Sequence, residues 1–156
     1  MDIAVVVGHP NHRSRTATTA HRVAAGLNGS TGPATLIDLA AMGRRLLDPS
    51  DTVLSQAIEE FCAADVVVVA SPTFRGTYSG LTKLFLDALP AGALAGRRAI
   101  PVLVGADADH TASRDHLADV LQELGAECPT GLFVAAPAGQ EIEIPEGWVD
   151  KARSVL

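Results

Sequence analysis

The stretch from His9 to Thr16 gathers side chains that are suited to binding an anion. It contains two arginines, two histidines and two hydroxyl residues, and it contains no acid. It follows a short apolar run that ends at Gly8, and it leads into a pattern typical of a helix. Free N–H groups at a helix N-terminus, with arginines and hydroxyls beside them, favour a phosphate group. The alternative is a solvated loop in front of an ordinary capped helix.

Several common motifs are absent from the sequence. The first stretch has neither the Lys-Ser/Thr pair of a P-loop nor GxGxxG spacing, which disfavours nucleotide hydrolysis and a Rossmann site. No serine stands in a GxSxG elbow, which disfavours an α/β-hydrolase. The first apolar run leads into basic rather than acidic residues, which excludes a response-regulator receiver. The candidate binding residues of this stretch are His9, Pro10, Arg13, Ser14, Arg15 and Thr16.

A second stretch, residues 71–80, combines two aromatic side chains with a proline and two glycines. Proline and glycine fix the path of the chain and free backbone amides for a planar ring, and Phe74 offers a face for stacking. The alternative is a turn whose aromatic residues anchor a helix or a subunit contact.

A third stretch, residues 105–110, carries two carboxylates and a histidine. Such groups suit metal or acid–base chemistry. However, their spacing matches no strong metal signature, so we favour a solvated loop in which Asp109 caps the next helix. We therefore expect no metal site.

The elements that position these stretches follow from the apolar pattern. We expect strands over the short, mainly apolar runs at residues 3–7, 34–39, 65–70, 99–104 and 132–135. Helical patterns run over 14–27, from about 51, over 79–89, over 111–124 and from about 145. Unbroken runs indicate a parallel sheet covered on both faces, so we predict a three-layer α/β sandwich with strand order 2-1-3-4-5. Such sheets bind ligands at the carboxyl ends of their strands, which is where the three stretches fall.

Composition narrows the class of protein. A chain of 156 residues, 47% hydrophobic, suits one domain over residues 1–156 with a real core. With 12 Lys+Arg against 18 Asp+Glu, the net charge of −6 disfavours binding to nucleic acid or a membrane surface. The two cysteines form neither a disulfide framework nor a zinc cluster, so we expect reduced, buried thiols in a cytoplasmic protein.

Two motifs resemble those of the NAD(P)H-dependent FMN reductases with a flavodoxin-like fold. Residues 70–90, ASPTFRGTYSGLTKLFLDALP, are similar to the signature Ser-Pro-x-Tyr-x-x-x-Tyr-Ser-Gly-x-x-Lys-x-x-Leu-Asp. Residues 8–16, GHPNHRSRT, are similar to the phosphate loop Gly-Ser-Pro-Arg-x-x-Ser-x-Ser/Thr. The resemblance covers residues 3–136. It is strongest to the reductases that supply flavin-dependent alkanesulfonate-type monooxygenases.

The resemblance implies a set of FMN-binding residues. Ser14 and Thr16, with the backbone of residues 10–15, would hold the phosphate. The flavin ring would pack against Pro72, Thr73 and Phe74, with Arg75 and Ser79 nearby. Residues Gly105, Ala106 and Asp107 would approach the pyrimidine edge.

The resemblance also implies an activity and an assembly. The enzyme would transfer a hydride from NADPH or NADH to FMN, with no strictly catalytic side chain. It would form a homodimer or homotetramer through the helix over 79–89, and a flavin-dependent monooxygenase is a candidate partner.

The sequence departs from the family pattern in two of the three stretches. His9 stands where the family has Ser, Asn11 where it often has Arg, and Ala106-Asp107 where it has Gly-Gly. These departures keep one alternative open, a flavodoxin-like binding or assembly protein with weak or lost turnover. A further alternative is an electron-carrying flavodoxin, which would hold FMN tightly but accept no hydride from NAD(P)H.

Overall fold

The computed structural model describes residues 1–29, 34–107 and 110–156. Its strands are β1 (Ile3–Val7), β2 (Thr35–Asp38), β3 (Val66–Phe74), β4 (Thr77–Tyr78), β5 (Arg98–Gly105) and β6 (Leu132–Ala135). Its helices are α1 (Arg15–Asn28), α2 (Leu39–Met42), the 3₁₀ helix η1 (Gly43–Leu47), α3 (Thr52–Ala63), α4 (Gly80–Asp87), α5 (Ala112–Glu123) and α6 (Trp148–Ser154).

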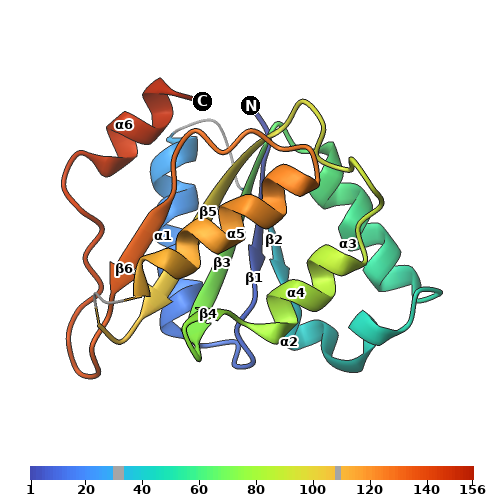
Figure 1. Cartoon of the computed structure of the whole chain (residues 1–156), viewed down its shortest axis with the longest axis horizontal. Coiled ribbons are helices and arrows are strands. Elements are labelled where there is room, and N and C mark those ends of the chain that lie inside the picture. The colour runs from blue at the N-terminus through green and yellow to red at the C-terminus, as the bar shows by residue number, and fades with distance from the viewer. Residues whose placement is uncertain (30–33, 108–109) are drawn as a thin grey trace.

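Five parallel strands form the sheet in the order β2-β1-β3-β5-β6, as the sequence predicts (Figure 1). This confirms the expected five-stranded parallel sheet, to which a short strand that was not expected, β4, adds by pairing antiparallel with the end of β3. Residues expected to form a loop are therefore a β-hairpin. Its turn has positive φ at both central residues, Arg75 (53°) and Gly76 (82°), as a two-residue type I′ turn requires.

A separate apolar core covers each face of the sheet, which confirms the three-layer arrangement (Figure 1). On one face α1 and α6 bury side chains such as Val23 and Ala152 against β1, β3 and β5. On the other face α2 to α5 do so, with Phe61 and Phe85 in contact edge to face. The central strands are buried on both faces as predicted, whereas the edge strand β2 exposes its first two residues.

Most predicted helix boundaries hold to within a few residues. Ser14 and Asp51 cap α1 and α3 through their side chains. Helices α2 and η1 occupy a segment expected to be a loop, because Asp38 caps α2 and Leu39 is buried in the core. Helix α6 begins later than expected, at Trp148. The proposed Asp109 cap lies outside the described residues.

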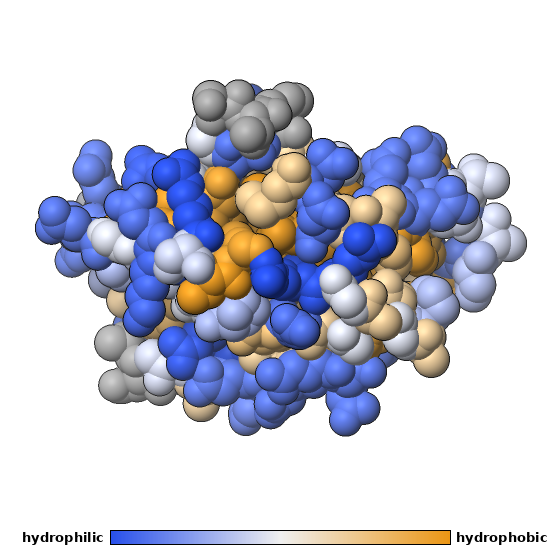
Figure 2. Space-filling view, turned by 90° about the horizontal axis from the view of Figure 1, so that it is seen from above, coloured by the Kyte–Doolittle hydropathy of each residue, from blue (hydrophilic) through white to orange (hydrophobic). Residues whose placement is uncertain are grey.

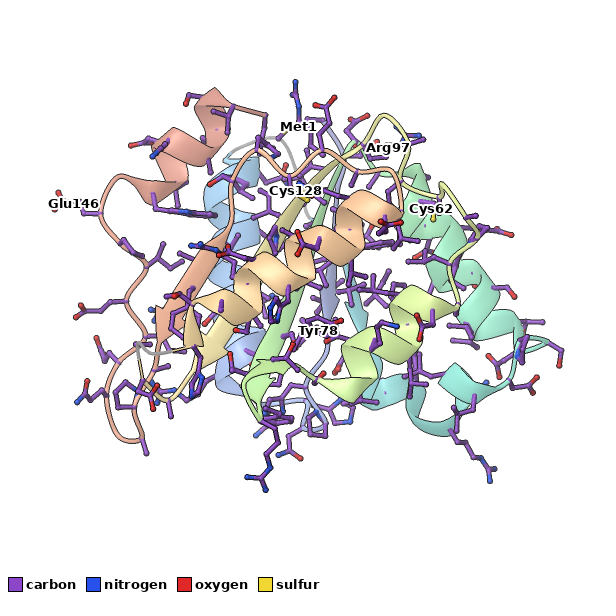
Figure 3. All side chains as sticks on the ribbon, viewed as in Figure 1. Met1, Cys62, Tyr78, Arg97, Cys128 and Glu146 are labelled. Carbon is purple, nitrogen blue, oxygen red and sulfur yellow. The ribbon has the colours of Figure 1, made fainter. Side chains whose placement is uncertain are left out.

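The two cysteines lie on different elements of the upper half of the molecule in Figure 3, Cys62 in α3 and Cys128 after α5. Both are free, and both are half-buried rather than fully buried as expected. Burial raises the pKa of both thiols, and that of Cys128 reaches about 11. These are the properties of unreactive thiols.

The edge of the sheet at which both chain ends lie, viewed in Figure 2, is mainly hydrophilic around a smaller apolar area. The three candidate stretches lie at the opposite edge. Among residues 1–29, 34–107 and 110–156, no helix is both long and apolar enough to cross a membrane. Within the same ranges no three His, Cys, Asp or Glu side chains gather as a metal site would require.

Candidate functional site

The loops that follow β1, β3 and β5 meet at the lower edge of the sheet in Figure 1. The first two loops are in direct contact. The N–H of Gly8 donates to the carbonyl of Ala70 at 2.8 Å, and the rings of His9 and Phe74 meet edge to face with centroids 5.8 Å apart. Parallel pairing of β1 with β3 and of β3 with β5 produces this convergence.

The N-terminus of α1 opens into this edge. Ser14 is its N-cap, and the hydroxyl oxygen accepts the N–H of Ala17 at 3.0 Å. The described residues supply no acceptor for the hydroxyl proton of Ser14, so it is available to a ligand. Thr16 is buried in the same turn, whereas Pro10 and Arg13 are exposed. The first turn of a helix also leaves backbone N–H groups without intrahelical partners.

Arg15 joins this turn to the C-terminal part of the chain. Its Nη2 donates to the carbonyl of Gln140 at 2.6 Å, and Arg22, two turns further along α1, donates to the carbonyl of Ile142 at 2.6 Å. The Nε of Arg15 is buried, and no described residue accepts a hydrogen bond from it. A buried cationic donor without an acceptor is costly, so the site favours an anion. Sequence reasoning missed Gln140 because no local pattern links residues 125 positions apart.

His9 is half-buried between the first two loops. Burial lowers the pKa of His9, while the Asn11 backbone contact and the charge of Asp38 act less strongly in the opposite direction. The Nδ1 of His9 accepts the N–H of Asn11 at 3.0 Å. The neutral ring therefore carries its proton on Nε2, the nitrogen that this bond leaves free.

Asp38 at the end of β2 adds an acid that sequence reasoning did not include in the site. One of its oxygens lies 2.6 Å from Nδ1 of His12, and the other caps α2 by accepting the N–H of Ala40. The signal was available, because the carboxyl end of β2 reaches the same sheet edge as that of β1. The pair fixes the first loop to the edge strand.

Ser79 is buried between the first two loops rather than exposed at the sheet edge. It is 3% exposed, and its hydroxyl donates to the carbonyl of Gly8 and accepts the N–H of Thr82. The N–H of Ser79 in turn donates to the hydroxyl of Ser71 at 2.8 Å. Ser79 therefore holds the two loops together, and its hydroxyl is already engaged within the protein. A side chain at Gly8 would collide with Thr82, which explains the glycine.

The β3–β4 hairpin presents its aromatic residue to solvent. Phe74 is 44% exposed, whereas Pro72 is buried beneath it. Thr73 is tied to α5, because its hydroxyl lies 3.2 Å from that of Ser113, which donates to the carbonyl of His110. Arg75 adopts left-handed backbone at the tip, a conformation that costs a non-glycine residue about 1 kcal/mol.

The third loop begins at a crowded glycine. A Cβ at Gly105 would lie 2.8 Å from the ring of Phe133, and the carbonyl of Gly105 accepts the N–H of Ala136 at 2.7 Å. Ala106 and Asp107 are exposed. An oxygen of Asp107 lies 3.6 Å from Nε2 of His110. The described part of this loop therefore presents Ala106 and Asp107 to solvent at the edge of the sheet.

Comparisons with known proteins place the chain in a family. The family model described as NADPH-dependent FMN reductase matches residues 1–141. FMN reductase (NADPH) of Escherichia coli K12 is 37% identical over 70 residues, which are 44% of this chain and 37% of that protein. NADH-dependent FMN reductase SfnF of Pseudomonas fluorescens Pf0-1 is 34% identical over 77 residues, 49% of this chain and 40% of that protein. The matches thus span less than half of these relatives.

Solved structures agree with this placement. The apo form of an NADH:FMN oxidoreductase (EMOB) superposes with a TM-score of 0.78 at 30% identity, covering 85% of this chain and 75% of that one. An FMN-dependent NADH-azoreductase from Bacillus anthracis in complex with FMN has a TM-score of 0.60 at 14% identity, covering 85% of each chain, and shares the fold. The chain therefore belongs to the NADPH-dependent FMN reductase family, with its flavodoxin-like fold.

Proposed function

We propose that the protein binds FMN at the carboxyl edge of the sheet and reduces it with NADPH or NADH. The observation that carries this proposal is the N-terminus of α1. There the buried Nε of Arg15, for which the described residues supply no acceptor, belongs to the residue after the Ser14 cap and its available hydroxyl. Together with family membership, this arrangement favours a phosphate ester as the ligand.

The residues of the three loops fit FMN in chemical type. Ser14, Arg15 and Thr16 would hold the phosphate together with the backbone of residues 10–15, and Arg13 would add positive charge. Phe74 would contact the flavin ring, supported by Pro72 and Thr73. The backbone of residues 105–107 would approach the pyrimidine edge. His9 would contribute its ring and, in its neutral form, an Nε2–H donor.

FMN supplies the hydride-accepting chemistry when it is bound, and the protein contributes binding and orientation. We assign no side chain as a proton donor or acceptor. Ser79 acts indirectly, because its buried hydroxyl fixes the first loop relative to the second. Asp107 would place a carboxylate near the pyrimidine edge, where negative charge disfavours an anionic reduced flavin.

The test is anaerobic mixing of FMN-loaded protein with NADPH and, separately, with NADH, following the flavin absorbance band. We expect the band to bleach with at least one nucleotide. Protein that neither retains nor reduces FMN would contradict the proposal. Tight FMN binding without bleaching would instead favour the binding-protein or electron-carrier alternatives.

We also propose that the protein assembles as a homodimer or homotetramer through α4. The support is an apolar groove of about 430 Å³ beside this helix. Two leucines that line it, Leu47 and Leu84, are 69% and 36% exposed. Contiguous exposed apolar surface of this kind marks interaction sites. Light scattering on a size-exclusion column would show a monomer if this proposal is wrong.

We propose a flavin-dependent monooxygenase as the recipient of the reduced flavin.

A further inference from the structure

Arg75 lies in a turn whose backbone conformation is unfavourable for a residue other than glycine. It occupies the first central position of the two-residue β3–β4 turn, with φ of 53°. Type I′ turns favour Asn, Asp or Gly there, because those residues tolerate left-handed backbone. An arginine that persists in such a conformation suggests that its side chain serves a purpose other than folding.

The charge of Arg75 is not used within the protein. Its side chain is exposed, and the described residues give it no ion pair or hydrogen bond. This contrasts with Arg15 and Arg22, which donate to backbone carbonyls, and with Arg45, which pairs with Asp51. In a protein of net charge −6, an exposed guanidinium without an acid beside it attracts anions.

The position of Arg75 separates it from the N-terminus of α1. It follows Phe74, the exposed aromatic residue whose ring contacts that of His9 edge to face. The FMN phosphate is accounted for by the turn around Ser14, to which Arg75 makes no described contact. The remaining anionic ligand of the reaction is the nicotinamide nucleotide, which must approach the exposed side of the flavin.

We propose that Arg75 is a specificity-determining residue that binds a phosphate group of the nicotinamide nucleotide. This inference rests on the proposed function. The phosphate is either the 2′-phosphate, which NADPH alone carries, or the pyrophosphate, which NADPH and NADH share. A guanidinium recognises both through charge-assisted hydrogen bonds.

The decisive variant is Arg75→Asn, because it should weaken nucleotide binding without lowering the stability of the fold. Asn suits the turn better than Arg, so the unfolding temperature should stay the same or rise. Binding of NADP⁺ to the FMN-loaded protein, measured by calorimetry, should weaken about tenfold, as expected for the loss of one charge-assisted hydrogen bond. Arg75→Lys should recover part of the affinity. Arg44→Ala, an exposed arginine of η1, is the matched control and should change neither quantity.

Titration with NAD⁺ identifies the phosphate. Weakening of NADP⁺ alone would assign the 2′-phosphate, and equal weakening of both nucleotides would assign the pyrophosphate; either supports the inference. Unchanged NADP⁺ binding in Arg75→Asn would overturn it. So would an equal loss of FMN affinity, measured separately by quenching of flavin fluorescence, because Arg75 would then belong to the flavin site. Wild-type protein that fails to bind FMN would refute the proposed function itself.

Discussion

Replacing Ser79 with alanine should destabilise the fold without removing a ligand contact. The hydroxyl caps α4, and the loss of an N-cap costs about 1 kcal/mol. It also donates to the carbonyl of Gly8, and an unsatisfied buried acceptor costs a further 1–2 kcal/mol, approximately. We therefore expect Ser79→Ala to lower the free energy of unfolding by about 2–3 kcal/mol. For a chain of this length that corresponds to roughly 5–10 °C in unfolding temperature.

The assay is urea unfolding followed by circular dichroism, paired with FMN titration. Ser14→Ala is the matched control, because it removes an N-cap whose hydroxyl faces the proposed phosphate. Ser14→Ala should cost only about 1 kcal/mol of stability but about tenfold in FMN affinity. Ser79→Ala should change FMN affinity by less than about threefold. If Ser79→Ala instead weakened FMN binding tenfold at nearly unchanged stability, Ser79 would be a ligand and the buried assignment would be refuted.

Three further predictions concern the same edge of the sheet. Gly8→Ala should destabilise the protein in urea unfolding through collision with α4, whereas Gly80→Ala, which meets open space, should be neutral or stabilising; equal effects would contradict the packing. Burial lowers the pKa of His9, so as the pH falls the unfolded chain takes up a proton at this position before the folded protein does. The free energy of unfolding should therefore fall as the pH drops below about 6.5, and His9→Ser should reduce this pH dependence in urea titrations. Arg15→Lys and Arg22→Lys should both speed proteolysis of residues 137–147, because each removes a hydrogen bond to that segment. Only Arg15→Lys should weaken FMN binding, and an equal loss of FMN affinity in both variants would count against a phosphate role for Arg15.

The strand order and the meeting of the three loops could be predicted because they follow from long apolar runs. The runs in β1, β3 and β5 are buried on both faces, and strands of this kind consist of nearly continuous apolar residues that can be recognised in the sequence. The caps at Ser14 and Asp51 are likewise local signals, since each side chain bonds to N–H groups two or three residues ahead. The order of the parallel sheet then places the loops.

The hairpin and the role of Ser79 could not be predicted in the same way. Arg-Gly is an unusual pair for a type I′ turn, so the turn chemistry around Arg75 gave no strand signal. The hydroxyl of Ser79 bonds to a carbonyl 71 positions away, and the Arg15–Gln140 contact spans 125 positions. Such contacts depend on tertiary structure alone. A motif can therefore locate a site while leaving open which of its residues face the ligand.

The extension of β3 as far as Phe74 has a consequence for how this surface could change during evolution. Phe74 is itself the last residue of the central strand β3, and its backbone pairs with Thr77 of β4, so its position is fixed by the sheet. Residues 66–72 allow little variation, because each is buried. Arg75 and Gly76 at the tip of the turn are exposed and bear no such restriction. Insertions or changes of charge in this turn could therefore alter which reductant the protein accepts while the sheet stays unchanged.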